Sequence, residues 1–92
     1  MKKVIKFSAS WCGPCRTMSP IVEKILKEDE FSNVVDFRPV DMDEDDENLG
    51  GKYGIRSIPT ILVIDEEDKV LDKLVGAVPE QSLRAFFQKN LL

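Results

Sequence analysis

The sequence predicts a single α/β domain over residues 1–92, with elements in the order β-α-β-α-β-β-α. Runs rich in β-branched and aromatic residues, which are typical of strands, alternate with stretches whose apolar residues recur at helical spacing. The length is enough for one small domain, near the lower limit for burying a core. No repeat, low-complexity segment or linker divides the chain.

The N-terminal part predicts a strand followed by a helix. Residues 2–9 (KKVIKFSA) form the strand. Ser10 is a candidate N-cap for a helix whose first turn holds Cys12 and Cys15, the only two cysteines. Pro20 lies inside this helix and predicts a kink, because it cannot donate a backbone hydrogen bond. The apolar face of the helix consists of Met18, Ile21, Val22, Ile25 and Leu26.

The middle of the chain predicts a second strand and an acidic loop. Residues 33–40 (NVVDFRPV) have the valine and phenylalanine content of a buried strand. Residues 41–55 are acidic at the front and glycine-rich in the middle. We expect a loop there, with a short helix near residues 44–52.

The C-terminal part predicts two strands and a helix. Residues 59–65 (PTILVID) are nearly all apolar, which favours a central strand. A charged turn at 66–68 leads into an antiparallel partner strand at 69–77. The last helix begins at Pro79, a favoured first-turn residue, and its apolar face consists of Leu83, Phe86, Phe87 and Leu91.

Composition narrows the function classes. The net charge of −4 argues against nucleic acid or an anionic membrane as the main partner, and no apolar run approaches a membrane span. The first ten residues make a poor secretory signal, so we expect a cytoplasmic protein. The chain has no histidine, which excludes Cys-His dyads and Cys/His zinc sites within one chain.

The Cys12–Cys15 pair has three interpretations. A structural disulfide would close a very short loop and contribute about 2 kcal/mol, less any strain. A closed zinc site needs four ligands, so it could only be shared between two chains, which nothing in the sequence supports. A reactive pair needs a stabilised thiolate, and the predicted helix N-terminus provides one at Cys12. Gly13 admits a partner and Pro14 pre-forms the first turn, so the reactive pair is favoured.

With these residues in place, the sequence resembles the thioredoxin family. WCGPC (11–15) is the family's active-site motif, YGIRSIPT (53–60) resembles its second signature, which carries a cis-proline, and VGA (75–77) resembles the third element of its substrate groove. The resemblance covers Val4 to Leu91. It implies the thioredoxin fold, a four-stranded mixed sheet flanked by three helices, and the activity of a protein disulfide reductase.

The resemblance also implies roles for single residues. Cys12 would be the attacking thiolate, Cys15 the resolving thiol and Pro59 the cis-proline that shapes the groove. The backbone of Ile58 would pair with an extended substrate segment. The implied contact surface consists of Trp11, Gly13, Pro14, Ile58, Gly76 and Ala77.

Some of these residues have simpler interpretations. Trp11 could be an ordinary packed aromatic, Pro59 a trans proline that opens a strand, and Gly76 a turn residue. For Pro59 the functional role is favoured, because IPT occurs together with WCGPC. For Gly76 and Ala77 the sequence favours neither interpretation.

The resemblance implies partners but no bound cofactor beyond the redox-active Cys12–Cys15 disulfide. The substrates would be disulfide-containing proteins, and a flavin- and NADPH-dependent thioredoxin reductase would regenerate the dithiol. We expect a monomer. Two rivals stay open: an oxidant, isomerase or glutaredoxin-like donor, and a protein-binding module whose disulfide chemistry is incidental.

The chain departs from the family at its N-terminus. We expect it to lack the usual extra N-terminal strand and helix. Lys6 stands where the family has a buried aspartate, and the position of the companion lysine falls near Pro39. A charged Lys6 about 6 Å from the thiols would lower a thiol pKa by roughly two units and make the disulfide more oxidising. Burial would instead neutralise Lys6, and a third alternative is that its amine simply reaches solvent.

Residues 41–48 (DMDEDDEN) are a second departure. Their alternating aspartates imitate the start of a calcium loop, but Asp46 and Lys52 stand where that loop needs glycine and glutamate. A solvated acidic loop with carboxylates near a helix N-terminus is the favoured interpretation.

Overall fold

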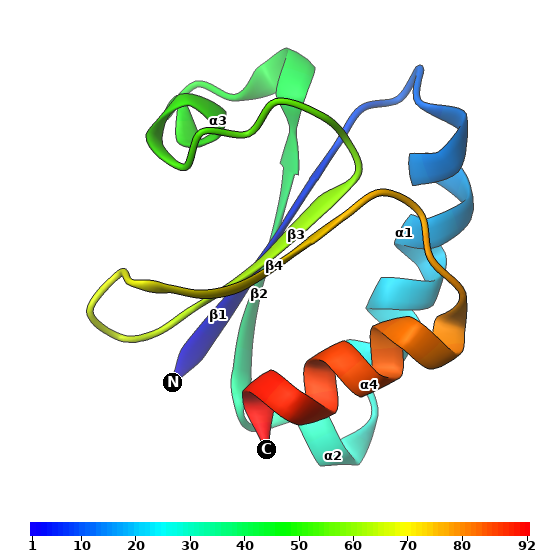
Figure 1. Cartoon of the computed structure of the whole chain (residues 1–92), viewed down its shortest axis with the longest axis vertical. Helices are drawn as coiled ribbons and strands as arrows, with labels where there is room; N and C mark the ends of the chain where they lie inside the picture. The colour runs from blue at the N-terminus through cyan, green and yellow to red at the C-terminus, as the bar shows by residue number, and fades with distance from the viewer.

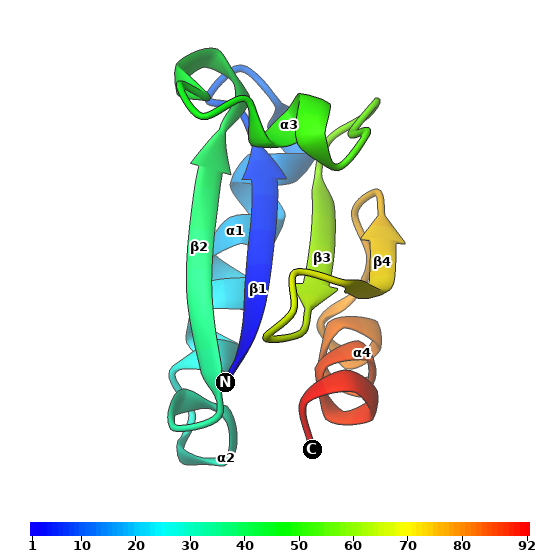
Figure 2. The ribbon, with the colours of Figure 1, turned by 90° about the vertical axis from the view of Figure 1, so that its left-hand side faces the viewer.

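A four-stranded sheet forms the centre of the fold in a computed structural model that describes residues 1–92. β2 runs parallel to β1, whereas β3 is antiparallel to both β1 and β4 (Figure 2). The sheet is therefore mixed, as expected, and β3 lies inside it. In spatial order the strands are β2 (Val35–Asp41), β1 (Lys2–Ser8), β3 (Thr60–Ile64) and β4 (Val70–Val75).

Helices lie on both faces of this sheet (Figure 1). The long helices α1 (Gly13–Leu26) and α4 (Glu80–Leu91) pack on one face. On the other face lie the 3-10 turn η1 (Met42–Glu44) and the short helix α3 (Leu49–Lys52). No helix of the structure has the length and apolar character needed to cross a bilayer.

The prediction of three helices missed α2 (Asp29–Ser32), which makes four α-helices in all. Phe31 of α2 is fully buried and meets Phe87 edge-on, with ring centroids 6.2 Å apart. A single turn has no periodicity for a sequence pattern to detect, so tertiary packing determines it. The one short helix expected near residues 44–52 is likewise two separate turns, η1 and α3.

The start of α1 also differs from the prediction, because Ser10 is not its N-cap. The backbone N–H of Cys12 donates to the carbonyl of Ala9 at 3.1 Å, and this turn leaves Ser10 exposed before the helix. Cys12 is the N-cap, with an extended backbone, and α1 begins at Gly13. The helix continues past Pro20, whose side chain is exposed.

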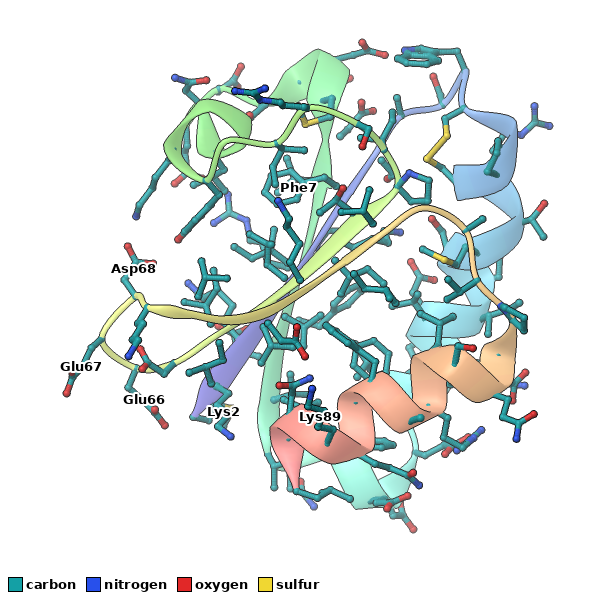
Figure 3. All side chains as sticks on the ribbon, in the orientation of Figure 1. Lys2, Phe7, Glu66, Glu67, Asp68 and Lys89 are labelled. Carbon is teal, nitrogen blue, oxygen red and sulfur yellow. A yellow bond between two sulfur atoms is a disulfide. The ribbon has the colours of Figure 1, made fainter.

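The core has one layer on each face of the sheet. Successive residues of a strand point to opposite faces, so Val4 packs toward α1 and α4 while Ile5 and Phe7 pack toward α3. Figure 3 shows Phe7 on the side of α3. Lys6 shares the face of Val4. The fully buried members of the larger layer are Val4, Met18, Val22, Ile25, Phe31, Ile61, Val63, Leu83 and Phe87.

Charged side chains tie α4 to α1 and to the residue before α2. Arg84 donates to the Glu28 carboxylate at 2.6 and 3.0 Å and to Glu80 at 3.1 Å. Lys24 of α1 donates to Glu80 at 2.8 Å. The hydrogen bond from Arg84 lowers the pKa of Glu28, and the hydrogen bonds from Lys24 and then Arg84 lower the pKa of Glu80.

Arg84→Gln is expected to lower stability at neutral pH and to leave it nearly unchanged in acid. A carboxyl with a lowered folded-state pKa adds stability above its unfolded-state pKa, and this stability is lost as the pH falls through the folded-state pKa. The urea midpoint of the variant should therefore lie below that of wild type at about pH 7, and the two midpoints should approach each other as the pH is lowered to about 3. The three side chains are only partly buried, so solvent screens their charges and the difference is small. Lys27→Gln, beside Glu28, is the matched control, and a pH-independent difference for Arg84→Gln would contradict the prediction.

Candidate active site

The two cysteines lie at the N-terminal end of α1, joined as a disulfide (Figure 3). Their Cα atoms are 5.2 Å apart, and Cys12 and Cys15 are 6% and 1% exposed. The backbone N–H of Cys15 donates to Cys12 Sγ at 3.2 Å. The first-turn N–H groups of a helix and its dipole stabilise negative charge, so this position favours a thiolate on Cys12.

The two residues between the cysteines keep the surface around them open. Pro14 is in the first turn of α1, as predicted, where it needs no backbone hydrogen bond. Gly13 and Pro14 are both exposed. A Cβ built on Gly13 would meet no atom within 4 Å, so nothing covers the chain here. A partner can therefore approach the disulfide from this side.

The IPT segment lies against the cysteines, although it is far from them in the sequence. Ile58 packs on the small buried cluster of Ala9, Cys12 and Cys15. The Ile58–Pro59 peptide bond is cis, which confirms that expectation and rules out the trans alternative for Pro59.

The end of β4 closes the same region. Gly76 has φ +92°, and its N–H donates to the Pro59 carbonyl at 2.8 Å. This left-handed backbone is accessible to glycine at little cost, so Gly76 is both a turn residue and a contact of the Pro59 segment. Ala77 follows it and is exposed. The structure thus brings all three sequence signatures to one end of the sheet.

Trp11 is 69% exposed, so it is not a packed core aromatic. Its Nε1–H donates to Asp43 Oδ1 at 3.4 Å. Beside it lies a pocket of about 170 Å³ lined by Trp11, Met42, Ile55, Arg56, Ser57 and Ile58. Asp43, Met42 and Ile55 were not among the predicted site residues. The acidic run at 41–48 contains the first two, and the signature at 53–60 contains Ile55.

Lys6 combines a buried stem with an unpaired charge. It lies between Pro39 and Ile61 on the neighbouring strands, is 4% exposed, and has its Nζ 6.0 Å from the ring centroid of Phe37. Burial lowers the pKa of Lys6, and the negative charge of Glu23 opposes this. Every buried side-chain nitrogen and oxygen has a hydrogen-bond partner, and Lys6 Nζ makes no bond, so it retains contact with solvent.

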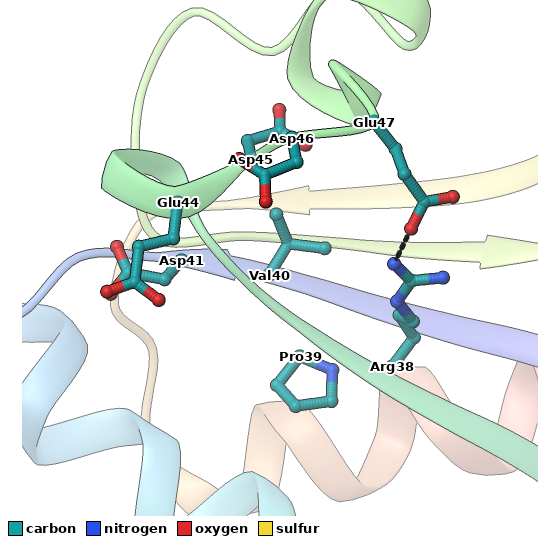
Figure 4. Close-up of a pocket in the computed structure, with 8 residues that line it drawn as sticks. All are labelled: Arg38, Pro39, Val40, Asp41, Glu44, Asp45, Asp46 and Glu47. Atoms are coloured by element: carbon teal, nitrogen blue, oxygen red, sulfur yellow. Dashed lines mark hydrogen bonds and ion pairs between the residues drawn. The ribbon is translucent and has the colours of Figure 1, made fainter.

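The acidic segment, whose carboxylates Figure 4 shows, caps short helices. Asp41 Oδ1 accepts from the Asp43 N–H at 2.9 Å at the start of η1. The Asp45 carboxylate accepts from the N–H groups of Leu49 and Gly50 at 2.8 Å each, at the start of α3. This agrees with the interpretation that its carboxylates lie near helix N-termini. A polar pocket of about 320 Å³ lies along the segment, crossed at one end by the ion pair between Arg38 and Glu47.

Comparison with known proteins gives one consistent answer. The thioredoxin family model matches residues 1–89. A thioredoxin of Chlorobaculum thiosulfatiphilum is 40% identical over 80 residues, covering 87% of this chain and 70% of the relative. Thioredoxin 1 of Synechococcus elongatus is 39% identical over 88 residues, covering 96% and 78%.

Comparison of the fold with solved structures also identifies thioredoxins as similar proteins. The crystal structure of a Malassezia sympodialis thioredoxin superposes with a TM-score of 0.86 at 33% identity, covering 99% of this chain and 76% of that one. The redox-active spacing of Cys12 and Cys15 completes the match. The chain therefore belongs to the thioredoxin family and is a thiol-disulfide oxidoreductase that reduces protein disulfides.

Proposed function

We propose that Cys12 attacks the disulfide of a substrate protein and that Cys15 resolves the mixed disulfide. The observation that carries this assignment is the hydrogen bond from the Cys15 N–H to Cys12 Sγ at the N-terminus of α1. It stabilises negative charge on Cys12 rather than on Cys15. Gly13 leaves the approach to the pair open.

The proposed cycle transfers two electrons. The Cys12 thiolate attacks one sulfur of the substrate, a Cys12–substrate disulfide forms, and the first substrate thiolate leaves. The Cys15 thiol then loses its proton and attacks Cys12 Sγ, which releases the second substrate thiolate. The substrate is reduced to a dithiol and the Cys12–Cys15 disulfide is formed.

The proposed substrate surface surrounds this pair. An extended segment would pair with the backbone of Ile58, next to Pro59, by strand addition. Support comes from the contact of Ile58 with the cysteine cluster, from the Gly76–Pro59 hydrogen bond and from the exposure of Trp11. The proposed contact residues are Trp11, Gly13, Pro14, Ile58, Pro59, Gly76 and Ala77.

We further propose a cytoplasmic monomer that is recharged by an NADPH-dependent flavin thioredoxin reductase. Family membership supports this electron source, and the net charge of −4 agrees with a soluble carrier. The test is reduction of insulin with dithiothreitol, glutathione or thioredoxin reductase plus NADPH as donor. Turnover with the reductase is expected, and no turnover with any donor would overturn the proposal.

Lys6 is proposed to make the disulfide more oxidising than it would be without this charge. This role requires the Lys6 amine to act on the thiols from β1, which leads to the cysteines: a nearby cation favours the thiolate, and a stabilised thiolate favours the reduced form. Lys6→Met is expected to raise the pKa of Cys12 and to shift the glutathione equilibrium toward the disulfide. Lys3→Met, on the opposite face of β1 at its far end, is the matched control. An unchanged thiol titration and equilibrium for Lys6→Met would leave Lys6 without this role.

A further inference from the structure

Resolution of the mixed disulfide poses a proton problem at Cys15. Only a thiolate attacks a disulfide sulfur, so the Cys15 proton has to leave before or during the attack. Cys15 is 1% exposed, and no carboxylate or amine is hydrogen-bonded to its sulfur. Burial in an apolar cluster with Ala9 and Cys12 disfavours the charged form. A route to a proton acceptor is therefore needed.

A pocket of about 230 Å³ reaches Cys15 between α1 and the ends of β1 and β2. Its volume is enough for several water molecules, and the serines in its wall carry hydroxyl groups that can donate hydrogen bonds to water or accept them. The polar and charged side chains of this pocket, together with the cysteine, are Ser8, Ser10, Cys15, Arg16, Ser19 and Asp41. Water can thus approach a residue that is otherwise buried.

Asp41 is the one carboxylate in the wall of this pocket. It is the last residue of β2 and pairs in register with Ser8 of β1, so the parallel strands bring both residues to the same end of the sheet. Its Oδ1 accepts from the Asp43 N–H at 2.9 Å, which orients the carboxylate. The side chain is exposed, so a proton that it takes up can pass on to solvent.

We propose that Asp41 accepts the proton of Cys15 through water held in this pocket. The Cys15 S–H bond breaks, its proton passes to water, and water gives a proton to the Asp41 carboxylate. The Cys15 thiolate then forms the bond to Cys12 Sγ while the Cys12–substrate disulfide breaks. Asp41 afterwards returns the proton to solvent. This inference rests on the proposed roles of Cys12 and Cys15.

No other charged side chain near this pocket can accept the Cys15 proton in place of Asp41. Arg16 of α1 shares the pocket, but a guanidinium cannot accept a proton. Lys6 lies on β1 facing α1, and it is not part of the pocket wall. On the other side of Asp41 lies the polar pocket of Figure 4, whose charged groups are Arg38, Glu44, Asp45, Asp46 and Glu47. None of these five reaches the pocket of Cys15.

The test uses the reduced protein and the disulfide reagent dithionitrobenzoate, whose coloured product is released in two steps. Attack by Cys12 releases the first equivalent, and resolution by Cys15 releases the second. Asp41→Asn keeps an oxygen that can cap η1 but removes the base. Asp46→Asn removes the same charge from the same segment outside the pocket and is the matched control.

Asp41→Asn is expected to leave the first phase unchanged and to slow the second about tenfold at neutral pH. In this variant the rate of the second phase should also depend more steeply on pH, and it should recover when formate is added as an external base. Asp46→Asn should match wild type in both phases. Equal second phases in the two variants, or slowing by Lys6→Met instead, would overturn the role of Asp41. Loss of the first phase in wild type would instead overturn the proposed function.

Discussion

Cys15→Ser is expected to stop catalytic turnover and to leave the protein joined to its substrate. Cys12 keeps its place as N-cap of α1, where the N–H of residue 15 can still donate to its sulfur. The attack on a substrate disulfide should therefore proceed. The serine hydroxyl cannot displace the substrate from Cys12, so the mixed disulfide should accumulate.

The loss of turnover should be large, because no external thiol replaces Cys15 efficiently. Well-oriented intramolecular groups act at effective concentrations of about 10⁵ M or more, far above any millimolar reductant. Insulin reduction should fall by at least about a thousandfold. Intact mass measurement should show the adduct, and added dithiothreitol should release it.

Cys12→Ser is the matched control, since it makes the same change at the other cysteine. This variant should be as inactive as Cys15→Ser but should form no adduct, because Cys15 is the deeper of the two sulfurs. An adduct on Cys15 in place of Cys12 would reverse the proposed roles. Normal function of the double serine variant would contradict the enzymatic role and favour a binding module.

The parts of the site that could be predicted from the sequence are those formed by residues close together in the chain. Cys12 and Cys15 come together because one helical turn separates them, and the IPT segment marks Pro59. The N-cap was less predictable, because Ser10 and Cys12 can both accept a hydrogen bond. The turn between Ala9 and Cys12 decides between them, and nothing in the local sequence shows it.

The parts that did not follow from the sequence depend on pairing between distant segments. The contact of Asp43 with Trp11 and the pocket that joins Asp41 to Cys15 both arise where the end of β2 meets the end of β1. The strands themselves were predictable, but their register was not. A shift of one residue would move Asp41 to the opposite face of the sheet.

Contacts between distant segments also decide where a substitution should lower stability most. We expect the largest loss for substitution of Phe87. This side chain is fully buried on α4, with its ring 6.2 Å from that of Phe31 and 5.7 Å from that of Phe86, both edge-on. Phe87→Ala removes a large apolar side chain from the layer that holds α2 and α4 to the sheet. Substitutions of this kind cost about 3–5 kcal/mol, through lost burial and the cavity left behind.

Such a loss is severe for a domain of this size, whose total stability is expected to be about 5–15 kcal/mol. Urea unfolding followed by circular dichroism should show a midpoint far below that of wild type. Gln88→Ala changes the adjacent, exposed residue of α4 and should alter stability by less than about 0.5 kcal/mol. If Phe87→Ala is unfolded without urea, Phe87→Leu should still fold, at a cost of about 1–2 kcal/mol. A midpoint for Phe87→Ala close to that of Gln88→Ala would mean that α2 and α4 do not depend on this contact.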